Sequence, residues 1–220
     1  MDRTKWPARA VLPVAQPGLK FIVIAILITG MLFYFGWVLF AWISFAVFLF
    51  VCWFFRDPER VTPKNEKSLI SPADGKVIIV EEQEKCEYLS GPCIKVSIFM
   101  NVFNVHVNRI PFDGTVQKVE YHHGKFMNAS FDKASIHNER NALMIKTSDD
   151  TSFAVVQIAG LVARRIVNCV KEGEIVKKGD RYGMIQFGSR LDLYLPKDFE
   201  VAVNIGEKTK AGSTIIGYMK

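Results

Sequence analysis

The sequence predicts a mainly β protein, in which a barrel-sandwich-like antiparallel β domain follows an N-terminal helical membrane hairpin. Three observations predict this fold. Residues 21–55 contain no Asp, Glu, Lys or Arg, whereas short runs rich in β-branched residues alternate with turn signals after Pro58. Two sequence patterns also occur twice in this later region. We therefore expect a basic segment 1–20, a membrane-anchoring hairpin 21–55 and a β-rich domain 56–220.

The apolar block 21–55 is long for a single membrane span. As one helix it would extend about 52 Å, whereas the hydrocarbon core of a bilayer is about 30 Å thick. Two short helices that turn near Gly36-Trp37 fit this length better than one steeply tilted span. The soluble alternative is a helical hairpin buried inside a globular protein.

Basic residues stand on both sides of the block, with Arg9 and Lys20 before it and Arg56 and Arg60 after it. The positive-inside tendency places both flanks in the cytoplasm, which a hairpin permits and a single span does not. The predicted location is therefore the cell membrane, with the β-rich domain on its cytoplasmic side. The net charge of +6 and its distribution indicate an anionic membrane surface as a partner, and no nucleic acid.

The region after Pro58 shows no long helical period. Turn signals such as Asp74-Gly75 and Asp113-Gly114 separate its apolar runs, which is typical of an antiparallel barrel or sandwich. The strands we expect are 76–80, 94–99, 115–119, 142–147, 152–158 and 183–187.

Two duplications support this class. The pattern Pro-x-Asp-Gly-x-Val occurs at 72–77 and 111–116, and Gly-Glu-x-x-Lys-x-Gly occurs at 173–179 and 206–212. Each copy reads as a turn that opens or joins strands, because Gly adopts positive φ without a steric penalty. Paired hairpins of this kind suit a barrel-sandwich arrangement, and this likeness of fold says nothing about function.

The four cysteines form no C-x-x-C motif, and no His stands at metal-ligand spacing from them. The sequence therefore predicts no metal site. Cys86 and Cys93 flank the turn 90–92 and are placed to face each other across a hairpin. Unpaired thiols in a reducing compartment are nevertheless our preferred interpretation.

The strongest chemical signal is Gly188-Ser189, at the end of an expected apolar strand. Backbone self-cleavage needs a Ser hydroxyl that attacks the preceding carbonyl, and Gly at that position leaves the approach open. The resulting ester loses its carboxylate by β-elimination, and hydrolysis of the dehydroalanine leaves a pyruvoyl group. A second dipeptide, Gly212-Ser213, is a decoy, because the duplication aligns Ser213 with Asp180 at an ordinary turn.

His106 and Asp74 are the other candidates for chemistry. His106 stands among Val residues, where it is either a core histidine with satisfied hydrogen bonds or a general base. Asp74 is either a turn aspartate or an acid that orients a base. The pattern does not distinguish Asp74 from its repeat counterpart Asp113.

Together these segments resemble the short form of the phosphatidylserine decarboxylases. The resemblance rests on four motifs in family order, and it spans nearly the whole chain. The motifs are Ser-Pro-Ala-Asp-Gly at 71–75, Asn-Val-His-Val-Asn-Arg-Ile-Pro at 104–111, Tyr-x-x-Gly-Lys-Phe at 121–126 and Phe-Gly-Ser-Arg at 187–190.

The resemblance implies an enzyme that matures by autocatalytic cleavage between Gly188 and Ser189. His106 would activate the Ser189 hydroxyl, and Asp74 would orient the histidine. The products would be a β chain 1–188 and an α chain 189–220 that begins with a covalent pyruvoyl cofactor and stays bound to the β chain. The mature heterodimer would decarboxylate phosphatidylserine to phosphatidylethanolamine in phospholipid biosynthesis, and its further oligomeric state is left open.

Two positions depart from the long form of the family. Phe103 stands where long forms have a second His, and Arg190 stands where they have Thr, so the proton donor in decarboxylation stays open. Our candidate for this donor is His106. Lys125, Arg109 and Arg190 are candidates for binding the lipid phosphate or the substrate carboxylate. The alternative for each of these three is a solvated surface charge.

Two other functions compete with this one. A pyruvoyl decarboxylase of a soluble amino acid would use the same chemistry at Ser189, but it would have no need for a membrane hairpin. A membrane-tethered, non-enzymatic barrel-sandwich carrier would need a modified Lys in a Met-Lys-Met or Asp-Lys-Ala tripeptide at a hairpin tip. The sequence has no Met-Lys-Met, and its single Asp-Lys-Ala, at 132–134, does not stand at an expected hairpin tip.

Overall fold

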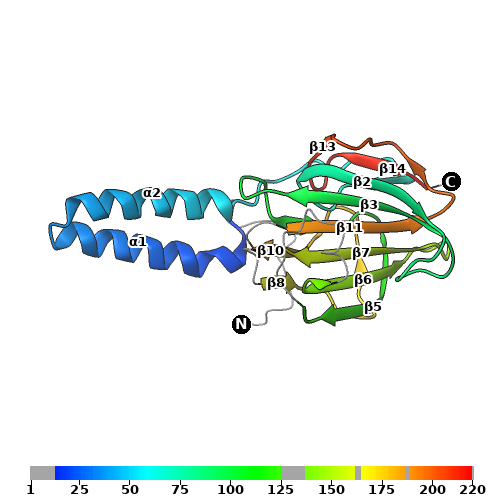
Figure 1. Cartoon of the computed structure of the whole chain (residues 1–220), viewed down its shortest axis with the longest axis horizontal. Coiled ribbons are helices and arrows are strands. Elements are labelled where there is room, and N and C mark those ends of the chain that lie inside the picture. The colour runs from blue at the N-terminus through cyan, green and yellow to red at the C-terminus, as the bar shows by residue number, and fades with distance from the viewer. Residues whose placement is uncertain (1–12, 125–136, 162–164, 187–188, 220) are drawn as a thin grey trace. The chain divides into compact units, whose positions relative to one another are not determined.

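The computed structural model describes residues 13–124, 137–161, 165–186 and 189–219. The chain forms two compact units, a smaller one that ends at Glu59 and a larger one that continues from Arg60. The first is helical and the second is built from antiparallel strands (Figure 1). The mainly β class and the N-terminal pair of apolar helices are therefore confirmed.

The helical unit contains a short 3-10 helix, η1 (Gln16–Gly18), followed by α1 (Leu19–Tyr34) and α2 (Val38–Phe54). The turn between α1 and α2 contains Gly36, whose φ of 74° favours glycine. Across the pair, the hydroxyls of Thr29 and Ser44 lie 2.8 Å apart.

Most large apolar side chains of these helices are exposed within the unit; Leu27, for example, is 65% exposed. Gln16–Tyr34 is 19 residues long and contains an 18-residue stretch with a mean hydropathy of 1.9, which is long and apolar enough to cross a membrane, whereas the apolar helix Val38–Phe54 is shorter.

The described residues of the larger unit form one eight-stranded antiparallel sheet and two three-stranded sheets. The strand order is β13-β2-β3-β11-β7-β6-β5-β9 in the large sheet, and β1-β14-β12 and β4-β10-β8 in the small ones. The bounds are β1 Ser68–Ile70, β2 Gly75–Gln83, β3 Cys93–Met100, β4 Val107–Arg109, β5 Gly114–His122, β6 Arg140–Lys146, β7 Ser152–Ala159, β8 Arg165–Asn168, β9 Ile175–Val176, β10 Arg181–Gln186, β11 Ser189–Pro196, β12 Glu200–Val201, β13 Lys208–Thr209 and β14 Ile215–Tyr218.

The six expected strands correspond to β2, β3, β5, β6, β7 and β10. One detail was wrong. Ser189 was expected at the end of an apolar strand, but the apolar strand β10 ends at Gln186 and Ser189 is the first residue of β11. Strand β11 was not expected at all, although it occupies the centre of the large sheet between β3 and β7.

The two patterns that are repeated in the sequence also form equivalent elements in the structure. β2 pairs with β13 and β5 pairs with β9, so each copy of one pattern pairs with a copy of the other. Gly75 and Gly114 begin equivalent strands, and a Cβ on them would lie 2.3 Å from Phe99 O and 2.6 Å from Lys146 O. Both positions therefore require glycine, because the neighbouring strand approaches too closely for any side chain.

The main core lies on one face of the large sheet. Alternate residues of each central strand point into it, as the period of a β-strand requires. In β11 these are Leu191, Leu193 and Leu195, which lie next to Val96 and Ile98 of β3. A smaller cluster around Tyr88 and Tyr194 covers part of the opposite face.

Candidate active site

The strand register brings the first residues of β2 and β11 to the same end of the large sheet as the last residue of β3. Lys76 of β2 pairs with Phe99, and Met100, the next residue of β3, pairs with Ser189. Asp74 therefore lies two strands away from Ser189, at a separation of about 10 Å given the usual strand spacing.

The segment that carries His106 reaches the same end by a different route. It follows β3 directly, after a turn in which the Asn101 and Asn104 side chains accept backbone N–H groups at 2.9 Å. The Arg109 N–H then donates to Pro72 O at 2.9 Å, which ties β4 to the segment that carries Asp74. Three motifs that are far apart in the sequence thus converge through backbone pairing.

Ser189 is fully buried, and its side chain points into the main core, because it alternates with Arg190 and precedes the inward-facing Leu191. Its Oγ has no hydrogen-bond partner among the described residues. A buried hydroxyl without a partner costs about 1–3 kcal/mol, so it is a feature that calls for an explanation other than packing.

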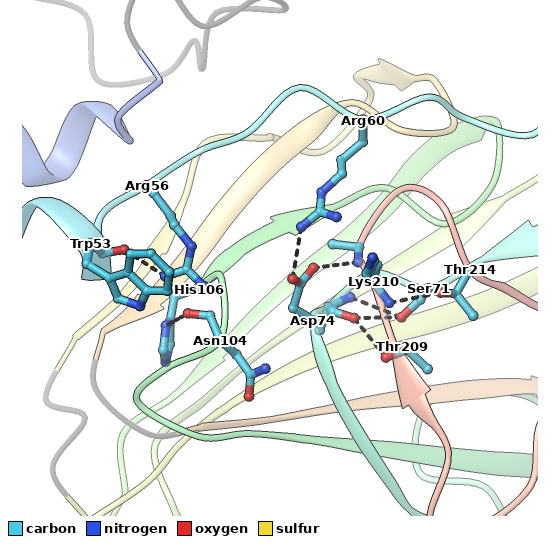
Figure 2. A network of polar contacts seen from close by, with 12 residues as sticks. Trp53, Arg56, Arg60, Ser71, Asp74, Asn104, His106, Thr209, Lys210 and Thr214 are labelled. Carbon is cyan, nitrogen blue, oxygen red and sulfur yellow. Dashed lines mark hydrogen bonds and ion pairs between the residues drawn. The ribbon is translucent and has the colours of Figure 1, made fainter.

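Asp74 lies in a network of polar contacts, where its carboxylate points toward Arg60 (Figure 2). The Asp74 Oδ2 atom accepts a hydrogen bond from Arg60 at 3.0 Å, and Oδ1 accepts the N–H of Ala211 at 2.7 Å. The turn beneath it is held by Ser71 and Thr209, whose hydroxyls donate to Ala73 O at 2.7 and 3.0 Å.

The counterpart Asp113 explains part of this geometry. Its Oδ1 accepts the N–H of Lys178, which the duplication aligns with Ala211. Both aspartates therefore hold the same kind of turn. They differ in burial, because Asp74 is only 8% exposed whereas Asp113 is exposed, and Asp74 also faces Arg60.

His106 is fully buried immediately before β4. Its Nδ1 lies 3.0 Å from Asn104 O, so Nδ1 carries the proton in that contact, and in the neutral ring the lone pair is on Nε2 (Figure 2). This hydrogen bond fixes both the tautomer and the direction of the ring, which a general base requires.

For Arg190, the alternative of a solvated surface charge is wrong. Arg190 and Asp192 are both fully buried, on the face of β11 opposite to Ser189. The guanidinium binds both carboxylate oxygens, at 2.6 and 3.0 Å, and also donates to Ser97 Oγ at 2.9 Å. The low-dielectric surroundings allow such a charge only because it is paired in this way.

The same correction applies to Arg109. It is 5% exposed, and its guanidinium donates to Gly179 O at 2.9 Å, which holds the turn before β10. Lys125 and Gly188 lie outside the described residues. Sequence reasoning missed Asp192 and Ser97. The alternation of polar and apolar residues in 189–195 is a signal for Asp192 but not for Ser97.

No group of three or more His, Cys, Asp or Glu side chains in the described residues could hold a metal ion. All four cysteines are free thiols. Burial raises the pKa of Cys93 to about 12 and also raises the pKa of Cys169. These two thiols are therefore structural rather than reactive.

Comparison with known proteins agrees with the arrangement of these motifs. The family model of phosphatidylserine decarboxylase matches residues 47–217. A phosphatidylserine decarboxylase proenzyme of Syntrophus aciditrophicus (strain SB) is 51% identical over 207 residues, which are 93% of this chain and 96% of the relative. The chain belongs to the phosphatidylserine decarboxylase family.

Other members of the family are similar over most of their length. The proenzyme of Magnetococcus marinus is 50% identical over 84% of this chain and 81% of the relative. The proenzyme of Burkholderia ambifaria (strain MC40-6) is 47% identical over 94% of this chain and 96% of the relative. The match to the phosphatidylserine decarboxylase model contains Asp74, His106 and Ser189, and it begins within α2.

Proposed function

We propose that this chain is a self-cleaving, membrane-anchored phosphatidylserine decarboxylase that converts phosphatidylserine to phosphatidylethanolamine. Membership of the family and the word proenzyme in the names of its relatives support both the reaction and a maturation step. The observation that carries the proposal is Ser189. Its buried Oγ has no partner among the described residues, and it lies at the end of the sheet where the motifs of Asp74 and His106 meet.

In this proposal the chain breaks between Gly188 and Ser189. His106 takes the proton of the Ser189 hydroxyl as Oγ attacks the preceding carbonyl, and its fixed ring supports this role. Asp74 acts at a distance of two strands. Its contacts with Arg60 and Ala211 hold the segment that binds β4, and so position the histidine.

Ser189 also fits the pyruvoyl cofactor, because a buried hydroxyl on a residue with a Cα–H is what formation of that group requires. The pyruvoyl group would supply an electrophilic ketone that takes up the substrate amine and draws electrons from the departing carboxylate. His106 is our candidate for returning a proton to the product. Arg109 and Arg190 are engaged with the protein itself, which leaves Lys125 among the three proposed lipid ligands.

Cleavage would leave the β chain 1–188 and the α chain 189–220 as a heterodimer. The α chain would begin with β11, which lies between β3 and β7 of the β chain. Arg190 would bind Ser97 across the new chain boundary, and β13 and β14 would stay paired with β2 and β1. The two chains would therefore separate only when the large sheet unfolds.

The helix pair supports anchoring in the membrane, with the β unit on the cytoplasmic side. Its exposed apolar side chains would be poorly solvated in water, and a phospholipid substrate is found in a bilayer. Basic residues before and after the pair are consistent with an anionic cytoplasmic surface.

The test uses purified full-length protein with phosphatidylserine in mixed micelles, and release of CO₂ and formation of phosphatidylethanolamine are measured. Ser189→Ala is expected to abolish both turnover and chain cleavage. Ser213→Ala, which changes the other Gly-Ser dipeptide, is the matched control and is expected to retain both. Turnover of free serine or aspartate in place of the lipid would favour a soluble-substrate decarboxylase, and an intact chain without turnover would favour a carrier.

A further inference from the structure

A chain of three buried amide side chains crosses the core beside Ser189. The Asn141 Nδ2 donates to Gln157 Oε1 at 3.2 Å, and the Gln157 Nε2 donates to Asn108 Oδ1 at 2.9 Å. The chain ends where the Asn108 Nδ2 points at the sulfur of Met100, at 3.8 Å. All four residues are at most 2% exposed.

The position of the Asn108 amide follows from the sheet order. Met100 belongs to β3 and Gln157 to β7, and these strands are the two neighbours of β11. Met100 pairs with Ser189, and Gln157 pairs with Leu191. An amide that contacts side chains from both strands therefore lies across β11, over its inward face at the level of Ser189.

The direction of this amide chain follows from its last contact. If all three amides were reversed, the Asn108 Oδ1 would face the Met100 sulfur, and two acceptors would meet. In the structure, an Asn108 N–H instead points at the thioether sulfur of Met100, which is only a weak acceptor. The Asn108 side chain, which is fixed by its hydrogen bond to Gln157, thus has a buried N–H whose acceptor is weak. It lies next to the buried Ser189 Oγ, which has no hydrogen-bond partner among the described residues.

We propose that Asn108 is a further catalytic residue of maturation, whose N–H stabilises the oxygen that leaves Ser189 in the elimination step. This inference rests on the proposed self-cleavage. Attack by Ser189 Oγ first forms an ester bond between Oγ and the Gly188 carbonyl carbon and breaks the peptide C–N bond. The hydroxyl proton that His106 takes passes to the departing nitrogen, which becomes the free Ser189 amine and leaves His106 neutral.

The elimination then proceeds as follows. A base, for which His106 is the candidate, removes the Cα proton of Ser189, and that electron pair forms the Cα–Cβ double bond. The Cβ–Oγ bond breaks, and its electrons stay on Oγ, which becomes one oxygen of the Gly188 carboxylate. Water then hydrolyses the dehydroalanine: its nitrogen leaves as ammonia, and the ketone that remains completes the pyruvoyl group. In the attack, charge that develops on Oγ passes to the Gly188 carbonyl oxygen as the new bond forms. In the elimination, negative charge grows on Oγ and stays on the carboxylate, so a donor placed there acts mainly on this step.

Two variants remove the donor in different ways. Asn108→Asp keeps the shape and still accepts from Gln157 Nε2, but it offers no N–H toward Ser189. In Gln157→Glu, the carboxylate accepts from both neighbouring amides, and so turns the Asn108 N–H away from β11. Asn141→Leu is the control, because it also loses one buried hydrogen bond to Gln157 but lies two strands away from β11.

Each purified variant would be followed by denaturing gel and mass spectrometry, before and after treatment with hydroxylamine. Hydroxylamine splits an ester at Gly188 and yields a fragment 189–220 with a free Ser amine; the sequence has no Asn-Gly bond that would also react. For Asn108→Asp and Gln157→Glu we expect elimination slowed about 10²–10³-fold, as for other single donors to a developing anion. The uncut but hydroxylamine-sensitive ester would accumulate, whereas Asn141→Leu would mature as the wild type does.

Two results would overturn the role of Asn108. One is maturation of either donor-removing variant at the wild-type rate. The other is a folded, uncut variant that hydroxylamine does not split, because the block would then precede the ester. If Asn108→Asp does not fold, Gln157→Glu decides the question, since it leaves Asn108 unchanged. A wild-type chain that is itself never cut would instead refute the proposed function.

Discussion

The buried pair of Arg190 and Asp192 gives the sharpest prediction for stability. Asp192→Asn removes the charge that compensates the guanidinium but keeps the shape and one acceptor oxygen. Both side chains are fully buried, so Arg190 would keep an uncompensated charge in the core. Breaking a buried pair in this way costs about 3–5 kcal/mol.

The size of the effect in a melting experiment follows from the size of the β unit. An unfolding entropy of about 2.1 cal/mol/K per residue gives about 0.34 kcal/mol/K for a unit of roughly 160 residues. A loss of about 4 kcal/mol therefore lowers Tm by about 12 °C. We expect this shift in thermal unfolding followed by circular dichroism, in a Ser189→Ala background that keeps the chain in one piece.

Two further variants make the test specific. Glu120→Gln makes the same acid-to-amide change in the partly exposed ion pair with Lys118, and there we expect a much smaller loss of stability. The double variant Arg190→Met/Asp192→Leu removes both charges and is expected to lie within about 1.5 kcal/mol of the parent. If Asp192→Asn costs no more than Glu120→Gln, water reaches the pair and the reasoning is wrong.

Two other predictions concern backbone packing and thiol chemistry. Gly75→Ala is expected to prevent folding of the β unit, and hence maturation, because its Cβ would meet Phe99 O at 2.3 Å. In the control Gly30→Ala, the new Cβ meets nothing within 4 Å, and the variant should stabilise α1 by up to about 1 kcal/mol. Equal yields of soluble, matured protein from the two variants would contradict the close packing at Gly75. With iodoacetamide at pH 8, the partly buried Cys86 should react well before the fully buried Cys93, whose pKa of about 12 leaves about 10⁻⁴ as thiolate. Because that pKa is raised, labelling of Cys93 should increase about tenfold per pH unit up to pH 12, and equal rates at pH 8 would refute its protection.

Local pattern was sufficient for much of the fold. The absence of charge in 21–55 and the turn at Gly36 predicted the helix pair, and alternating β-branched runs predicted the longer strands other than β11. Strand β11 was missed because Arg190 and Asp192 look like solvated residues in sequence. Only their mutual ion pair, which depends on the folded sheet, allows them to be buried.

The candidate site was predictable to a different extent. Ser189, His106 and Asp74 could be selected by residue chemistry and family resemblance, but no local pattern contains the strand register that brings their segments to one end of the sheet. The distinction between Asp74 and Asp113 likewise appears only in the fold, as a difference in burial and in the contact with Arg60. Asn108 stands inside the motif 104–111, but nothing in the sequence shows that its amide is buried, because an amide in a strand is ordinary until its partners are known.

The most direct test of the central claim is the intact mass of the freshly purified wild-type protein. Self-cleavage at Ser189 predicts two polypeptides, and the smaller one, residues 189–220, would have a blocked N-terminus, a mass that fits pyruvoyl in place of serine, and a ketone that reacts with borohydride. A single chain of 220 residues that has an ordinary N-terminal amine and does not react with borohydride would contradict self-cleavage at Ser189.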